Sequence, residues 1–131
     1  MVEKILVAGG LGNVGLLLNL HDSEKRFINA SRTPKSNKQI KINPRSISDL
    51  ICSIKNSGCS SILLLSAMSN NNDCENDNIS SCFANIELPQ NFAIAAKECN
   101  RKLIFVSTDY IYNGDIQIKK TELSENIKPI N

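Results

Sequence analysis

The segment ILVAGGLGNVG, residues 5–15, combines an apolar run, a cluster of glycines and the start of a helical stretch. Its first four residues are apolar without alternation, which is typical of a parallel strand buried on both faces. The glycines satisfy G-x-x-G-x-x-G through Gly9, Gly12 and Gly15, and G-x-G-x-x-G when Gly10 replaces Gly9. Such spacing permits a tight turn, close approach of a pyrophosphate to the backbone, and close packing of helix on strand. The segment therefore predicts a dinucleotide-binding turn.

The helix that follows this turn, expected over residues 14–20, directs its free N–H groups and its positive dipole end at the phosphates. The residues expected to contact the cofactor here are the spaced glycines and the first helical residues, namely Gly9, Gly12, Asn13, Val14 and Gly15. The alternative is a glycine turn in a domain that binds no nucleotide.

Beyond the turn, short apolar runs alternate with helical stretches. The further strands are expected at residues 26–30, 40–42, 61–65 and 102–106, and the further helices at 48–55 and 81–100. Strands that are apolar on both faces and alternate with helices predict a doubly wound parallel sheet, a Rossmann-like α/β fold with five strands. Residues 1–131 are expected to form one such domain.

Two details of the chain carry further expectations. Pro89 lies inside the helix expected at 81–100 and should kink or split it. Residues 70–80 are predicted to form a polar loop. The residues of the long helix that are expected to face the sheet are Phe83, Ile86, Phe92, Ala95 and Ala96.

Composition excludes several classes of partner. The net charge of +2 is spread along 131 residues without a Lys/Arg block, which argues against nucleic acid and anionic membranes. No apolar run approaches the ~20 residues of a membrane span. A strand that begins near Lys4 leaves no room for a signal peptide, so a cytoplasmic protein is expected.

Five cysteines with no Cys-x-x-Cys pair argue against both a disulfide framework and a zinc site. We expect reduced thiols and no bound metal.

The end of the second strand bears on the choice of cofactor. A carboxylate at this place would bind the ribose hydroxyls of NAD, whereas an arginine accommodates the additional phosphate of NADP. The chain offers Ser31 and Arg32 and no acid. We therefore expect Arg32, supported by the Ser31 hydroxyl, to bind the 2′-phosphate, and NADP(H) to be preferred over NAD(H). A surface arginine without a ligand is the alternative.

Three further groups of residues, taken with the glycines, indicate a family. Ser66-Ala67-Met68 follows the fourth strand, Asn85 and Asn91 lie in the long helix, and the sequence STDYIYNG occupies residues 107–114. With these residues the chain resembles the extended short-chain dehydrogenase/reductases, and within them the dTDP-4-dehydrorhamnose reductase branch. The Ser-Thr-Asp-Tyr stretch is the most specific part of the resemblance.

The resemblance implies the reduction of a 4-keto sugar carried on dTDP, a nucleotide-sugar reaction typical of dTDP-rhamnose biosynthesis. It implies that Thr108 is the catalytic Ser/Thr that polarises the substrate carbonyl. It also implies a cofactor contact for Ser66, Ala67 and Met68. The residues expected to contact the sugar are Ser107, Asp109, Tyr110 and Tyr112.

Departures from the family limit these expectations. Ala8 replaces a threonine, Ser66 replaces an asparagine, and Asn43 stands where the family has an aspartate beside the adenine. The family's chemistry needs Tyr-x-x-x-Lys, which occurs nowhere in the 131 residues, and residues 122–131 resemble the segment that precedes it. We therefore expect a C-terminally truncated, cofactor-binding part of an oxidoreductase that is inactive alone.

Other interpretations stay open. They are a non-catalytic dinucleotide-binding or regulatory module of the same family, an NAD-dependent sugar-nucleotide epimerase or dehydratase, and a shortened gene product. Each keeps the fold and changes the chemistry.

The expected strand order is 3-2-1-4-5-6, and the sequence supplies no sixth strand. The fifth strand, within residues 102–107 (KLIFVS), should then be an apolar edge with unpaired backbone groups. We expect the chain to self-associate through it.

Overall fold

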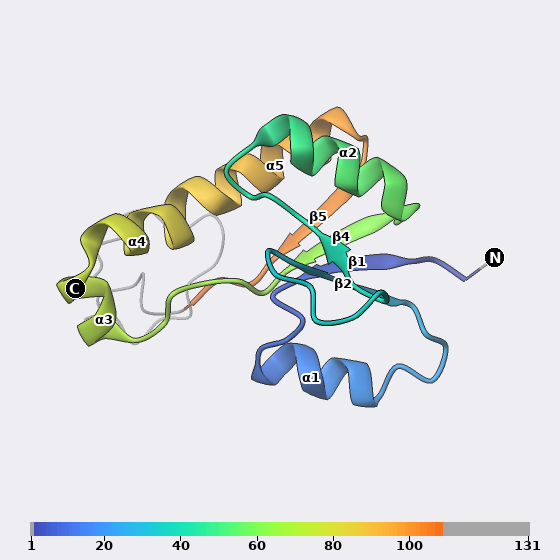
Figure 1. Cartoon of the computed structure of the whole chain (residues 1–131), viewed down its shortest axis with the longest axis horizontal. Helices are drawn as coiled ribbons and strands as arrows, with labels where there is room; N and C mark the ends of the chain where they lie inside the picture. The colour runs from blue at the N-terminus through green and yellow to red at the C-terminus, as the bar shows by residue number, and fades with distance from the viewer. Residues whose placement is uncertain (1, 109–131) are drawn as a thin grey trace, which may run out of the picture.

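The computed structural model describes residues 2–108, which form a five-stranded parallel sheet in the order β3-β2-β1-β4-β5 (Figure 1). This confirms the predicted doubly wound α/β fold. The strands are β1 (Ile5–Ala8), β2 (Phe27–Ser31), β3 (Ile40–Lys41), β4 (Ser61–Leu64) and β5 (Lys102–Phe105). Each lies close to the range expected from the sequence.

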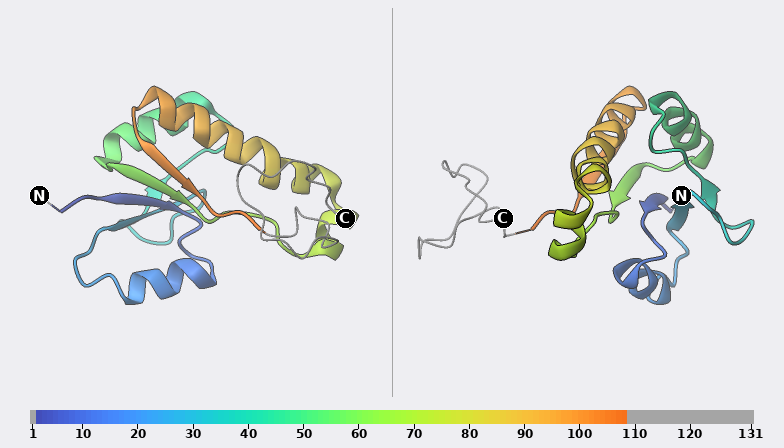
Figure 2. Two further views of the ribbon diagram at one scale, coloured as in Figure 1. Left: turned by 180° about the vertical axis from the view of Figure 1, so that it is seen from behind. Right: turned by 60° about the vertical axis from the view of Figure 1, so that its left-hand side comes forward.

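Helices cover the sheet on both sides. One face carries α2 (Ile47–Ser57) and α5 (Leu88–Glu98), and the opposite face carries α1 (Asn13–Leu20), as the two views of Figure 2 show. None of the helices among the described residues is long and apolar enough to cross a membrane.

The hydrophobic core lies between the sheet and the pair α2 and α5. Strand residues alternate between the two faces, and Leu6 on β1 and Ile62 on β4 are paired and fully buried. From the helices, Leu50, Ile54 and Phe92 are also fully buried and belong to the same cluster. This core fixes β1 and β4, and therefore the turns that follow them.

The helix expected at residues 81–100 departs from the predicted form. It runs as α4 (Asn78–Cys82), a π-helical turn η1 (Phe83–Glu87) and α5. The Leu88 N–H donates to the carbonyl of Phe83, five residues earlier. Pro89 has no N–H for an α-helical bond, so the irregularity falls on the turn before it.

This π-turn explains a wrong prediction. Ile86, expected to face inward, is 53% exposed, while Leu88 is buried instead. The buried positions Phe83, Leu88 and Phe92 are five and then four residues apart, because the π-turn adds a residue to the helical repeat.

The predicted polar loop at 70–80 is also wrong, because it contains α3 (Asn71–Asn76) and the start of α4. The polar side chains here serve as helix caps: Asn70 accepts from the Asp73 N–H and Asp77 from the Ser80 N–H. Similarly, Ser46 caps α2, and its hydroxyl accepts from the Asp49 N–H.

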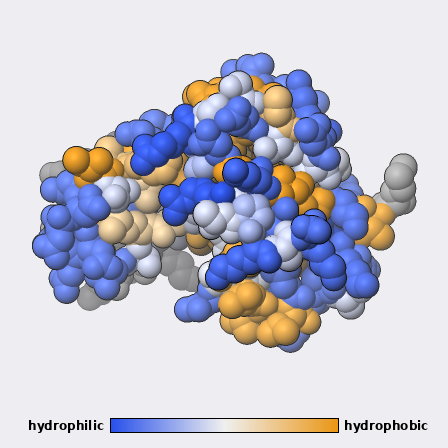
Figure 3. Space-filling model, viewed as in Figure 1, coloured by the Kyte–Doolittle hydropathy of each residue, from blue (hydrophilic) through white to orange (hydrophobic). Residues whose placement is uncertain are grey.

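Apolar side chains remain exposed on two elements. On α1 only Gly15 is buried, and Leu17 and Leu20 are 59% and 79% exposed. The apolar area at the lower edge of Figure 3 lies over this helix. On and beside β5, Ile104 and Val106 are 40% and 54% exposed. Among residues 2–108, β5 pairs only with β4, so its other side is an edge of the sheet.

We predict that the chain self-associates through β5. An apolar strand edge with unpaired N–H and C=O groups is a template for pairing with another chain. Light scattering over a concentration series should show an average mass that rises with concentration. Ile104→Lys should reduce this rise, because a charge on an edge strand opposes pairing. A wild type that stays monomeric at high concentration would refute the prediction.

Candidate functional site

The glycine turn follows the carboxyl end of β1, and its backbone conformation allows a phosphate to approach closely. Gly9 has φ 90°, and a Cβ on it would lie 2.8 Å from the Ser66 backbone nitrogen. The Gly12 N–H donates to the Gly9 carbonyl at 3.0 Å. Helix α1 then begins at Asn13 without a side-chain cap, so its first N–H groups are left for a ligand.

Gly10 and Gly15 serve the packing behind this turn. A Cβ on Gly15 would collide with the Gly10 backbone, and a Cβ on Gly10 would collide with the Asn29 side chain. Asn19 Nδ2 donates to the Gly15 carbonyl at 2.6 Å, and Asn29 Nδ2 donates to Asn19 Oδ1 at 2.9 Å. This partly buried amide network fixes α1 against the turn, and it was not foreseen from the sequence.

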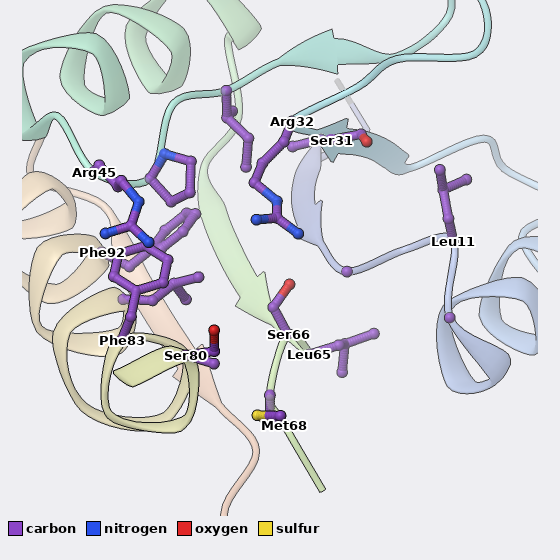
Figure 4. A pocket seen from close by; sticks show the side chains of 18 residues that line it. Leu11, Ser31, Arg32, Arg45, Leu65, Ser66, Met68, Ser80, Phe83 and Phe92 are labelled. Atoms are coloured by element: carbon purple, nitrogen blue, oxygen red, sulfur yellow. The ribbon is translucent and has the colours of Figure 1, made fainter. Parts of the chain in front are cut away.

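A cavity of about 550 Å³ lies at the carboxyl ends of β1, β2 and β4 (Figure 4). Its volume is within the range of small-molecule and cofactor sites. Seven of the predicted cofactor-binding residues line it: Gly9, Gly12, Ser31, Arg32, Ser66, Ala67 and Met68. The topology brings together three turns that are far apart in the sequence.

Other predicted site residues lie elsewhere. Asn13 and Val14 begin α1 without lining this cavity, and Gly15 packs behind the turn. Ser107 and Thr108 are exposed. They follow the carboxyl end of β5, beside the carboxyl end of β4, which Ser66 follows. Asp109, Tyr110 and Tyr112 lie outside the described residues.

The segment after β4 is held by the π-turn. Asn85 Oδ1 accepts from the Met68 N–H at 2.9 Å, and Asn85 Nδ2 donates to the Met68 carbonyl at 3.0 Å. The Cys74 thiol donates to the same carbonyl at 3.3 Å. These contacts fix the backbone at Met68 and thereby one wall of the cavity.

The described lining of the cavity is positively charged. Its charged members are Arg32 and Arg45, and it contains no carboxylate. Arg45 lies over the ring of Phe83, with its guanidinium carbon 3.7 Å from the ring centre. In Figure 4 the Arg32 guanidinium points into the cavity from the end of β2, and Arg45 lies above Phe83. Neither Arg45 nor Phe83 was predicted as a site residue.

Three ionisable groups outside the cavity, Asp22, Asp77 and Cys99, have shifted pKa values. Desolvation alone would raise the pKa of Asp22, but hydrogen bonds from the backbone N–H groups of Phe27 and Arg26 lower it below its ordinary value. Hydrogen bonds from the Ser80 hydroxyl and then from its N–H lower the pKa of Asp77, which caps α4. Burial raises the pKa of the Cys99 thiol, which favours its protonated form. The cysteines of the described region are free, with Cys59 buried and Cys52 exposed.

The residues present fit a dinucleotide. At Gly12 the turn leaves space where a side chain would stand, since a Cβ there would meet only the Gly9 carbonyl oxygen, at 3.4 Å. The uncapped end of α1 supplies N–H donors, and Arg32 supplies a positive charge at the end of β2. This combination is suited to a pyrophosphate and a further phosphate.

Comparison with solved structures shows the same fold in several reductases and dehydrogenases. A hypothetical dTDP-4-dehydrorhamnose reductase from Sulfolobus tokodaii has a TM-score of 0.81 at 22% identity, covering 98% of this chain and 46% of that chain. The dTDP-4-dehydrorhamnose reductase from Bacillus anthracis, solved in complex with NADP, has a TM-score of 0.72 at 21% identity, covering 89% and 40%.

The L-threonine dehydrogenase from Clostridium difficile has a TM-score of 0.77 at 19% identity, covering 98% and 44%. The chain thus spans less than half the length of these three proteins. None of the curated proteins matches it by sequence.

The family model described as RmlD substrate binding domain matches residues 3–131, which is nearly the whole chain. The glycine turn, the five-stranded sheet and the cavity described above all lie within that range. This chain belongs to the RmlD substrate binding domain family.

Proposed function

We propose that the chain is the cofactor-binding part of an NADP(H)-dependent nucleotide-sugar reductase, and that the complete reaction transfers a hydride to a 4-keto sugar on dTDP. The observation that carries this proposal is the cavity in which the glycine turn, Arg32 and the segment after β4 converge. The similar enzyme from Bacillus anthracis, which was solved with NADP, supports it.

In this proposal each wall of the cavity binds one part of the cofactor. The Gly9–Gly12 turn and the N–H groups of α1 bind the pyrophosphate. Arg32 and Ser31 bind the 2′-phosphate of the adenosine. Ser66, Ala67 and Met68 line the cavity beyond the pyrophosphate, and Asn85 holds their backbone in place. The bound cofactor supplies the hydride.

Thr108 acts on the substrate in this proposal. Its hydroxyl donates a hydrogen bond to the 4-keto oxygen and so polarises the carbonyl, an effect worth about 3 kcal/mol at comparable sites. Thr108 follows the carboxyl end of β5, beside the carboxyl end of β4, which Ser66 follows, and this position supports the role. Ser107, Asp109, Tyr110 and Tyr112 contact the sugar.

Arg32→Ala is predicted to remove the preference for NADPH. The wild type should bind NADPH about 10-fold more tightly than NADH, because a hydrogen bond between charged partners contributes about 1.5–3 kcal/mol. Calorimetric titration of both cofactors measures this ratio. Arg26→Ala, which removes an exposed arginine paired with Glu24 away from the cavity, should leave it unchanged. Equal affinities of the wild type for NADPH and NADH would show that the predicted preference is wrong.

The chain alone is predicted not to reduce a keto sugar. Thr108 can polarise a carbonyl, but the sequence contains no Tyr-x-x-x-Lys to deliver the proton. NADPH oxidation with dTDP-4-keto-6-deoxyglucose should stay at background. Oxidation clearly above background in the wild type, and lost in Thr108→Val, would contradict this prediction.

A second candidate is a non-catalytic dinucleotide-binding or regulatory module of the same family, in which the cavity binds the cofactor and no reaction follows. An NAD-dependent epimerase or dehydratase is a third candidate, and the structural similarity to the UDP-N-acetylglucosamine 4-epimerase from Bacillus cereus supports it. The cofactor titration separates the third from the first, because NADH would then be the tighter ligand.

A further inference from the structure

A second cavity, of about 370 Å³, adjoins the first, and its described lining is rich in cations. It shares Arg32, Ile42, Pro44, Arg45 and Phe83 with the larger cavity. We propose that Arg45 is a second determinant of cofactor specificity, and that it binds the 2′-phosphate from the side opposite Arg32, assisted by Lys41. This inference rests on the proposed function, in which the cavity takes NADP(H).

The three cations come from the ends of two neighbouring strands. Arg32 follows β2, Lys41 ends β3, and Arg45 lies in the turn between β3 and α2. Strands β2 and β3 are paired through Ser31 and Lys41, so their carboxyl ends lie side by side. Within the described residues, no carboxylate forms an ion pair with any of the three. A cavity with this charge suits a dianion such as a phosphate ester.

Arg45 is held in place before a ligand arrives. Its guanidinium lies 3.7 Å from the centre of the Phe83 ring, and Phe83 is itself 7% exposed. An arginine stacked on an aromatic ring keeps the edges of its guanidinium free for hydrogen bonds. Because its side chain is already ordered, binding a phosphate costs less conformational entropy than it would for a free surface arginine.

The backbone under Arg45 is also fixed. Asn43 Oδ1 accepts from the Arg45 N–H at 3.3 Å, and the Asn43 carbonyl accepts from the Ser46 N–H at 3.1 Å. Asn91 Nδ2, from α5, donates to the Pro44 carbonyl at 2.9 Å. Hydrogen bonds within the turn and from α5 therefore fix the backbone around Arg45, which supports its role in binding.

One carboxylate, that of Asp49, lines the second cavity and could oppose an anion. Asn43 Nδ2 donates to Asp49 Oδ2 at 2.9 Å, and Asp49 lies in the first turn of α2, where the helix dipole favours a negative charge. The carboxylate is thus compensated from within the chain. Three positive charges facing one compensated carboxylate leave the cavity cationic.

The test uses 2′,5′-ADP and 5′-AMP as probes, because they differ only in the 2′-phosphate. Both are titrated calorimetrically into the wild type and into Arg45→Gln, Lys41→Gln and a control, Lys97→Gln. Lys97 lies in the last turn of α5 and lines neither cavity. Arg45→Gln should weaken the binding of 2′,5′-ADP about 10-fold and change the binding of 5′-AMP less than about 2-fold. The control should change neither.

Salt provides a second readout. Raising the ionic strength should weaken 2′,5′-ADP less in Arg45→Gln than in the wild type, because one cation–phosphate interaction is already lost. A wild type that binds neither probe would overturn the proposed function itself. Three results would overturn the role of Arg45 and leave nucleotide binding standing: equal affinity of the wild type for both probes, equal weakening of both by Arg45→Gln, or no effect of that variant.

Discussion

Gly9→Ala is expected to lower the affinity for NADPH about 100-fold. The new Cβ would stand at φ 90°, a conformation that L side chains rarely adopt, and 2.8 Å from both the backbone nitrogen and the hydroxyl oxygen of Ser66. The turn must shift to relieve the contact with Ser66. We expect this shift to cost two of the hydrogen bonds that the N–H groups of the turn and of the start of α1 donate to the pyrophosphate. Each hydrogen bond to a charged group contributes about 1.5–3 kcal/mol. Calorimetric titration with NADPH measures the loss.

Gly58→Ala is the matched control. Gly58 also has a positive φ, 65°, as the C-cap of α2, but a Cβ on it would meet nothing within 4 Å. It should reduce stability by about 1 kcal/mol through the left-handed backbone and leave NADPH affinity unchanged. If both variants bound NADPH as well as the wild type, the glycine turn would not be the pyrophosphate site. Circular dichroism should show that both are folded.

Phe92→Ala is expected to lower the free energy of unfolding by about 3–5 kcal/mol. Phe92 is fully buried in the cluster that joins α5 to the sheet and α2, and no smaller side chain would fill its space. Because the total stability of a small domain is about 5–15 kcal/mol, most of it could be lost. Denaturant unfolding followed by circular dichroism measures the change.

Ile94→Ala serves as the comparison on the same helix. Ile94 is 46% exposed, so its truncation should cost about 1 kcal/mol or less. Equal losses for the two variants would mean that α5 does not pack in the orientation described here. The π-turn before α5 determines that orientation, so this pair of variants also tests the helical register.

The first half of the chain could be read from its sequence because local signals agree there. At residues 5–15 an apolar strand, the glycine spacing and the following helix all indicate one strand–turn–helix unit, and the structure has β1 and α1 at these places. Arg32 was predicted to contact the cofactor because it follows the carboxyl end of β2, and ligands bind at the carboxyl ends of the strands in such sheets. The structure puts it in the cavity lining.

The second half was read less well because its register depends on tertiary contacts. The π-turn moves Ile86 to the surface and brings Leu88 inward. The spacing of apolar residues in the sequence does not predict that shift. Asn85 and Asn91 were recognised only by resemblance, whereas the structure gives each a backbone partner, Met68 and Pro44. Arg45 could have been found by asking which charges follow β3, as was done for β2.

We infer that this chain binds NADP(H) in the cavity at the carboxyl ends of β1, β2 and β4. The most direct measurement is the change in backbone amide chemical shifts of the ¹⁵N-labelled chain on addition of NADPH. We expect the largest changes at Gly9, Gly12, Arg32 and residues 66–68, and none at Gly58, which lies away from the cavity. Saturating NADPH that left the amides of the glycine turn unmoved, or moved only residues outside the cavity, would contradict it.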